Sequence, residues 1–155
     1  MNSERLTPGF AAILVDHGSR RAESNELLER ITAEFQRATR IQIVEPAHME
    51  LADPSIHAAF GRCVEQGAER IVVFPYFLGP GRHWDEDIPR LAAEASERYG
   101  GVPYLVTAPL GLDDLMLQLI AKRIEACLAH AERNGEVCDF CRGTERCRFR
   151  TGGGE

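Results

Sequence analysis

The chain has 155 residues, of which 44% are hydrophobic and 27% charged, as is typical of a single globular domain. Its formal net charge of −6 argues against a nucleic-acid partner. No apolar run is long enough to span a membrane. The N-terminal segment MNSERLTPGF also lacks the charged-then-apolar pattern of a signal peptide. We therefore expect a cytoplasmic protein without a membrane partner, whose residues 1–9 form a flexible leader.

A buried strand is predicted over residues 10–16, because its apolar run has no polar alternation. The run stops at Asp16, and the polar residues His17, Gly18 and Ser19 follow. The carboxyl end of such a strand is where open α/β sheets bind ligands, so His17 is a candidate site residue. The alternative is a histidine that merely caps a turn.

The next segments alternate between helical and extended patterns. Residues 23–38 place apolar side chains on one face of a helix, and an extended segment begins at residue 41. That segment contains Pro46, which a regular ladder tolerates only at an edge or a bulge. A second helix is expected over 54–66, with Asp53 as its N-cap and Gly67 able to serve as its C-cap.

Two further strand–helix pairs complete the chain. Residues 70–76 have no polar alternation, so we expect helices on both faces of this strand. A Gly- and Pro-rich loop follows over 77–83, and a helix follows over 85–99. The last pair is a strand over 102–108 and a helix that opens at Gly111 and continues to about residue 131.

This order, βαβαβαβα, predicts an α/β fold with a four-stranded parallel sheet and helices on both faces. We expect it to occupy residues 10–134, followed by a cysteine-rich tail over residues 135–155. Four strands leave exposed sheet edges, and pairing of two chains is one way to cover them.

Two loops after predicted strands combine a histidine with glycine and arginine. They are DHGSRR at residues 16–21 and GPGRH at residues 79–83. Strands one and three are neighbours in doubly wound sheets, so His17 and His83 should face one cleft. Glu50 joins the same rim from the second strand. Two imidazoles and a carboxylate suit Fe²⁺, Co²⁺ or Ni²⁺, and an imidazole also accepts protons near neutral pH. The alternative for Glu50 is a surface carboxylate before a helix.

Three arginines, Arg20, Arg21 and Arg82, lie beside these histidines in an acidic protein. Guanidinium groups bind carboxylates bidentately, so the cleft suits a polyanionic metal ligand. We include Ser19 of the same loop among the candidate substrate-binding residues. The alternative is that Arg20 and Arg21 only begin a solvated helix face.

Other titratable residues are weaker candidates. His48 and His57 carry less signal, and His57 lies among apolar residues of the second predicted helix. Cys63 on that helix is expected to be a buried core thiol. His130 lies near the end of the last helix, where a cation complements the helix dipole.

The other four cysteines, Cys127, Cys138, Cys141 and Cys147, cluster near the C-terminus with the spacing C-x10-C-x2-C-x5-C. In a reducing compartment such clustering favours metal binding over disulfides. Four thiolates satisfy either a tetrahedral zinc site or an iron–sulfur cluster. Thiols without metal remain an alternative, as does replacement of one thiolate by His130.

Three segments together resemble the small sirohydrochlorin chelatases, the SirB/CbiX group. They are DHGSRR after the first strand, ELADPSI after the second and FPYFLGPGRHWDEDIP after the third, and the resemblance covers roughly residues 10–130. It implies a fold equal to half of a larger two-domain chelatase, a homodimer, and insertion of a divalent metal into the tetrapyrrole sirohydrochlorin. The two metal-contacting histidines of that family map onto His17 and His83, and its acidic residue maps onto Glu50.

The tail resembles that of the plant-type sirohydrochlorin ferrochelatases, which implies a [2Fe–2S] cluster on Cys127, Cys138, Cys141 and Cys147. The leading hypothesis is therefore a lyase-type ferrochelatase that inserts Fe²⁺ into sirohydrochlorin to make sirohaem. Cobalt or nickel insertion is the alternative within the family, because metal choice does not follow from two histidines. A metal or tetrapyrrole carrier without turnover and a redox sensor with a working tail are the alternatives from other classes.

Overall fold

The computed structural model describes residues 9–132, 140–142, 144 and 146–150. The expected leader, apart from Gly9, lies outside this described part, and so does Cys138 of the expected tail. The chain forms two compact units, residues 1–111 and 112–155, which we describe separately.

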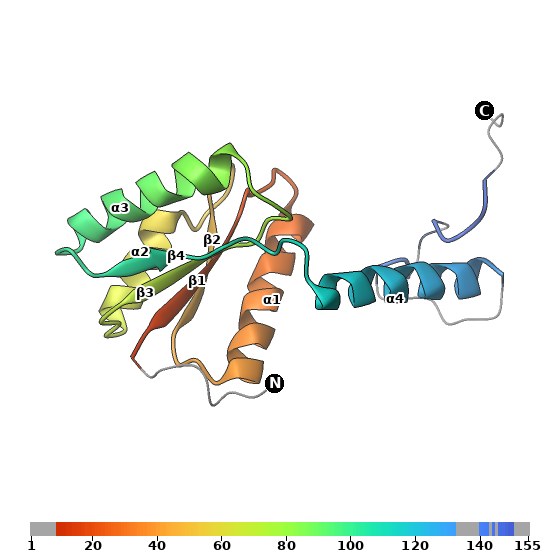
Figure 1. Cartoon of the computed structure of the whole chain (residues 1–155), viewed down its shortest axis with the longest axis horizontal. Helices are drawn as coiled ribbons and strands as arrows, with labels where there is room; N and C mark the ends of the chain where they lie inside the picture. The colour runs from red at the N-terminus through yellow and green to blue at the C-terminus, as the bar shows by residue number, and fades with distance from the viewer. Residues whose placement is uncertain (1–8, 133–139, 143, 145, 151–155) are drawn as a thin grey trace. The chain divides into compact units, whose positions relative to one another are not determined.

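The first unit is a parallel sheet with helices on its faces (Figure 1). The strands follow the order β2-β1-β3-β4, and each neighbouring pair is parallel. The predicted fold class is therefore confirmed. In chain order the elements of the first unit are β1 (Ala11–Asp16), α1 (Ala22–Thr39), β2 (Val44–His48), α2 (Ile56–Glu65), β3 (Ile71–Pro75), the π-helical turn η2 (His83–Asp87), α3 (Ile88–Arg98) and β4 (Tyr104–Val106).

Alternation along β1 explains why the sheet has two cores. Ile13 and Val15 are buried against α2 and α3, whereas Leu14 points to the opposite face and is buried with Leu28 of α1. β1 lies inside the sheet and is apolar on both faces, as its sequence predicts. Pro46 lies in β2, which is an edge strand, so its missing N–H costs no ladder hydrogen bond.

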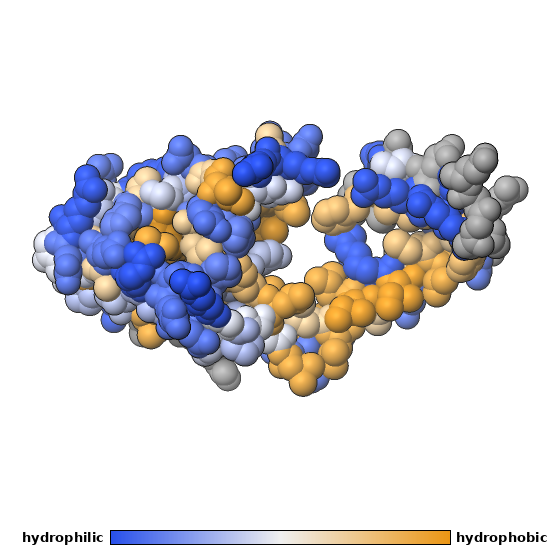
Figure 2. All heavy atoms as spheres, turned by 90° about the horizontal axis from the view of Figure 1, so that it is seen from above, coloured by the Kyte–Doolittle hydropathy of each residue, from blue (hydrophilic) through white to orange (hydrophobic). Residues whose placement is uncertain are grey.

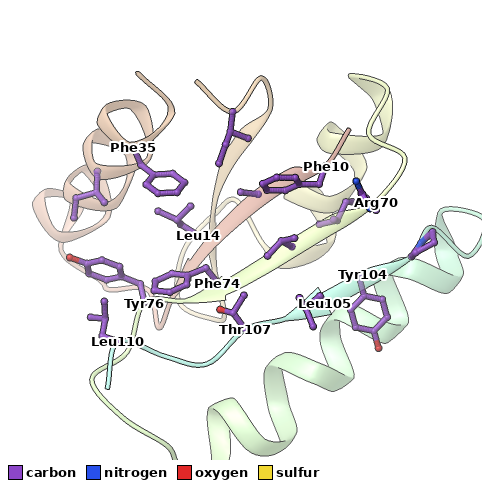
Figure 3. Close-up of a pocket in the computed structure, with 16 residues that line it drawn as sticks. Phe10, Leu14, Phe35, Arg70, Phe74, Tyr76, Tyr104, Leu105, Thr107 and Leu110 are labelled. Atoms are coloured by element: carbon purple, nitrogen blue, oxygen red, sulfur yellow. The ribbon is translucent and has the colours of Figure 1, made fainter. Parts of the chain in front are cut away.

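The α1 face of the sheet is only partly covered within the described part of the first unit. A groove of about 750 Å³ opens there beside β3 and β4, with aromatic and aliphatic side chains around it (Figure 3). Val72 and Phe74 of β3 line this groove and are half-buried. The expectation that helices cover both faces of β3 is therefore wrong for this unit, because α1 packs over β1 and β2 instead.

The starts of two helices differ from expectation. Ser55, not Asp53, is the N-cap of α2: its hydroxyl accepts a hydrogen bond from the N–H of Ala58. The Asp53–Pro54 peptide bond is cis, so Pro54 belongs to the preceding turn. The third helical segment begins two residues earlier than predicted, at His83, because the π-helical turn η2 precedes α3.

The second unit contains α4 (Asp114–Ala131) and the described residues of the tail. Asp113 caps α4 through its carboxylate, which accepts a hydrogen bond from the N–H of Leu115. Hydrophobic side chains gather along this helix, as Figure 2 shows. Among the described helices, none has the length and apolar character needed to cross a membrane.

Candidate functional site

The site begins at the carboxyl edge of the sheet, where β1 and β2 end side by side. Their parallel register pairs Asp16 with His48, so the residues that follow both strands emerge together. Nε2 of His17 lies 2.9 Å from Oε1 of Glu50, and both side chains are partly accessible to solvent. The structure therefore brings together two of the three residues predicted to handle the metal.

Gly18 makes this close approach possible. The N–H of Met49 donates to the carbonyl of Asp16, and the N–H of Glu50 donates to the carbonyl of His17. A Cβ atom on Gly18 would lie only 2.0 Å from the carbonyl oxygen of Glu50. Gly18 also has a φ of 82°, in the left-handed region that favours glycine. Only glycine fits between the two loops without moving one of them.

A hydrogen-bonding contact between Asp16 and His48 supports the same two loops. Nδ1 of His48 lies 2.5 Å from Oδ1 of Asp16, and the His48 side chain is completely buried. The same carboxylate oxygen accepts a hydrogen bond from the N–H of Gly18 at 2.9 Å. Asp16 therefore ties the end of β2 to the turn that carries His17. Nε2 of His48 is buried and has no partner within the described part of the chain.

His83 occupies the first position of η2, after β3. Its Nδ1 lies 2.8 Å from Oδ2 of Asp87, one turn later in the same segment. The hydrogen bond with His83 is the main cause that lowers the pKa of the Asp87 carboxyl below its usual range. The Phe77 ring lies beside His83 with centroids 6.2 Å apart. π-Helical turns of this kind are frequent at functional sites.

The two imidazoles meet edge to face at the carboxyl edge of the sheet. The ring centroids of His17 and His83 are 5.2 Å apart, with an angle of 70° between the ring planes. Because β1 and β3 are parallel neighbours, their carboxyl ends share this edge. Two imidazoles and a carboxylate are donor types that suit a divalent transition metal and leave coordination positions open, but the donor atoms of these three residues do not all lie within 4.8 Å of one another in this structure.

The predicted substrate-binding residues are neighbours of these two histidines in the chain. Arg20, Arg21 and Arg82 are all exposed, and Nε of Arg82 is 3.5 Å from Oε2 of Glu86. The hydroxyl of Ser19 accepts a hydrogen bond from the N–H of Arg21, so it already helps to form the turn before α1. Arg20 and Arg21 follow His17 in the chain, and Arg82 directly precedes His83.

Sequence reasoning missed two residues of this site, Asp16 and Asp87, and it named His48 only as a weaker candidate. Each lies within four residues of a predicted site residue in the sequence. Spacing alone could have suggested Asp87, because residues four apart share a helix face. The pairing of Asp16 with His48 depends on strand register across 32 residues, so no local signal identifies it.

The second unit gathers three of the four C-terminal cysteines predicted as ligands, Cys127 from α4 and Cys141 and Cys147 from the tail. The sulfur atoms of Cys127, Cys141 and Cys147 all lie within 4.8 Å of one another, and those of Cys127 and Cys147 are 3.9 Å apart. All three side chains are partly buried. Such a set of thiols fits the requirements of a zinc or iron–sulfur site, which needs one further ligand.

Of the weaker candidates, Cys63 is buried in the core and burial raises the pKa of its thiol to about 12, as expected for a structural cysteine. His57 is half-buried, with Nε2 3.6 Å from Oε2 of Glu94. His130 lies in the last turn of α4, as expected.

The fold and this site together define an α/β protein with a paired-imidazole site at the carboxyl edge of a parallel sheet. Residues 11–127 match the model of the CbiX family, and the chain belongs to that family. It is 54% identical over 137 residues to a protein of Arabidopsis thaliana named sirohydrochlorin ferrochelatase, chloroplastic, covering 88% of this chain and 61% of the relative.

Two further comparisons give the same family. A Methanocaldococcus jannaschii protein named sirohydrochlorin cobaltochelatase is 44% identical over 81 residues, covering 52% of this chain and 57% of the relative. The solved structure of SirB from Bacillus subtilis with Fe³⁺ has a TM-score of 0.70 and 28% identity, covering 74% of this chain and 46% of that one. The chain thus spans less than two thirds of the length of each of these relatives.

Proposed function

We propose that this protein is a chelatase that inserts Fe²⁺ into sirohydrochlorin to make sirohaem. The observation that carries the proposal is the facing pair of His17 and His83, with ring centroids 5.2 Å apart and Glu50 in contact with His17. Membership of the CbiX family and the 54% identity to a plant sirohydrochlorin ferrochelatase support the choice of reaction and substrate.

Insertion exchanges a divalent metal for the two N–H protons of the macrocycle, so the site has to deliver a metal and remove protons. Imidazole nitrogens of His17 and His83 serve as metal ligands that pass the ion to the pyrrole nitrogens. Glu50, whose Oε1 lies 2.9 Å from Nε2 of His17 and which is open to solvent, accepts protons together with that imidazole and passes them to water. Arg20, Arg21 and Arg82 bind peripheral carboxylates of the substrate, and Ser19 contributes a polar group at the same rim.

The experiment is a metal-insertion assay. Purified protein is incubated anaerobically with sirohydrochlorin and Fe²⁺, and the absorption spectrum is followed. An enzyme gives many product molecules per chain. With a carrier, the change in the spectrum stops at an amount proportional to the protein added. Replacing His17 or His83 with Ala should abolish insertion while the thermal midpoint stays nearly unchanged, because both side chains are partly exposed. Full activity in both variants would refute the assignment of the site.

Cobalt insertion is the second candidate, since one relative is named a sirohydrochlorin cobaltochelatase. The donor atoms of the site do not distinguish the two ions. The same assay with Co²⁺ and Ni²⁺, compared by kcat/KM against Fe²⁺, decides between them.

For the tail we propose a [2Fe–2S] cluster held by Cys127, Cys141 and Cys147, with Cys138 as the fourth ligand. The convergence of three sulfur atoms within 4.8 Å supports a metal or cluster at this place. A bound cluster of this type supplies one-electron redox chemistry. Anaerobically purified protein should be brown and contain iron matched by acid-labile sulfide. Colourless protein with one zinc per chain would refute the cluster.

We further propose that the protein is a homodimer that acts in the cytoplasm. β2 and β4 are edge strands of the sheet, and pairing of chains is one way to protect such edges. The thiol-rich tail favours a reducing compartment, and the plant relative is named a chloroplastic protein. Light scattering that reports a monomer at micromolar concentration would refute the dimer.

A further inference from the structure

The two imidazoles of the site are held in opposite ways. His17 has its Nε2 against Glu50, so the nitrogen at the tip of the ring is already engaged. His83 has its Nδ1 against Asp87, so the nitrogen at the rear of the ring is engaged. Among the described residues, Nε2 of His83 has no hydrogen-bond partner and about 45% of the side chain is accessible. Within the described part of the chain, His83 therefore presents an unpartnered outer nitrogen to an incoming ion, whereas the outer nitrogen of His17 is shared with Glu50.

We propose that Asp87 is a positioning residue that fixes the tautomer and the ring orientation of His83, so that Nε2 of His83 receives the metal substrate. The inference rests on the proposed function and assigns one residue a role within that site. An ionised carboxylate only accepts hydrogen bonds, so the 2.8 Å contact places the proton of a neutral imidazole on Nδ1. The lone pair that binds a metal then lies on Nε2.

The segment that carries this pair is held in place at both ends. The indole Nε1 of Trp84 donates to the carbonyl of Thr107 at 2.8 Å, which ties η2 to the segment after β4. Ile88, directly after Asp87, is completely buried in the core between the sheet and α3. The Asp87 side chain is itself only 22% exposed. The carboxylate is therefore attached to rigid structure, which a group that orients a ligand requires.

The chain provides a matched control and a reporter. Asp85 is a carboxylate of the same turn, exposed to solvent, and its replacement changes the net charge by the same amount. Trp84 is the single tryptophan of the chain and follows His83 directly, so its fluorescence reports an ion bound at that imidazole. The signal assigned to this site is the part of the fluorescence quenching by Ni²⁺ that the substitution His83→Ala removes.

The experiment titrates the full-length protein with Ni²⁺ alone and compares Asp87→Ala, Asp87→Asn and Asp85→Ala with the unaltered chain. We expect Asp87→Ala to weaken the His83-dependent binding by about 10- to 100-fold, as is typical of such partners. Asp87→Asn, whose amide oxygen still accepts a hydrogen bond, should give a smaller loss, and Asp85→Ala should give none. Equal affinity of Asp87→Ala and Asp85→Ala would overturn the proposal.

A second measurement reports the tautomer directly and needs no enzymatic activity. Imidazole ¹⁵N spectra should show His83 with its proton on Nδ1 in the unaltered protein, and the proton redistributed toward Nε2 in Asp87→Ala. A proton on Nε2 in the unaltered protein would overturn the proposal. If Ni²⁺ quenching does not depend on His83 at all, the metal site of the proposed function fails together with it. If quenching depends on His83 but not on Asp87, only the positioning role fails.

Discussion

Substitution of Gly18 by Ala tests whether the close approach of the two loops sets the geometry of the site. A Cβ at this position would lie 2.0 Å from the carbonyl oxygen of Glu50, whereas ordinary contacts begin at 3.4 Å. The loops that carry His17 and Glu50 must therefore separate by about 1.4 Å. Displacements on the order of 1 Å in a catalytic site cost about 10²-fold in rate.

Gly67 provides the matched control for this substitution. Its φ of 90° is close to the 82° of Gly18, but a Cβ there would meet nothing within 4 Å. Gly18→Ala and Gly67→Ala both place a side chain on left-handed backbone, which lowers the free energy of unfolding by about 1–2 kcal/mol. Gly18→Ala also overpacks the contact with Glu50, which lowers it by roughly a further 1–3 kcal/mol. The difference between the two variants therefore isolates the effect of the contact.

The assays are urea unfolding and metal insertion into sirohydrochlorin. We expect Gly67→Ala to lose about 1–2 kcal/mol of unfolding free energy and to keep its insertion rate. Gly18→Ala should lose about 2–5 kcal/mol and roughly 10²-fold in insertion rate, measured where the variant remains folded. If the two variants match in both measurements, the close approach at Gly18 does not control the site.

Three further outcomes are expected. Replacing Arg20, Arg21 or Arg82 with Gln should weaken sirohydrochlorin binding more at about 0.01 M than at about 1 M ionic strength, because salt screens exposed charges. A loss of binding that does not depend on salt would indicate a packing role instead. The folded state raises the pKa of Cys63 from 9.0 to about 12, so its contribution to stability is present below pH 9 and is lost as the pH rises toward 12. Cys63→Ala should make the free energy of unfolding fall less steeply with pH in that range. If the slope of unfolding free energy against pH is unchanged, Cys63 is not the group responsible. Cys141→Ser, or removal of the tail metal by a chelator, should bleach the protein while insertion at the sheet site partly survives; complete loss of insertion would show that the tail is part of the chelatase site.

Much of the fold follows from local sequence. The apolar run that ends at Asp16 has no polar alternation, and only a strand inside a sheet buries such a run on both faces. Pro46 lacks an N–H, which restricts its strand to an edge. The parallel order of βα units then brings His17 and His83 to the same edge of the sheet, since sequence spacing fixes which strand each residue follows.

The tertiary structure decided the contacts that orient these residues. The bond between Asp16 and His48 and the approach of Gly18 to the carbonyl of Glu50 depend on the register of β1 against β2. Register is set by packing between segments far apart in the chain, and no window of local sequence contains it. The turn η2, which holds Asp87 against Nδ1 of His83, likewise depends on anchors at Thr107 and in the core. Local sequence determined which strand each histidine follows, and packing between distant segments determined which groups contact it and which of its ring nitrogens is available.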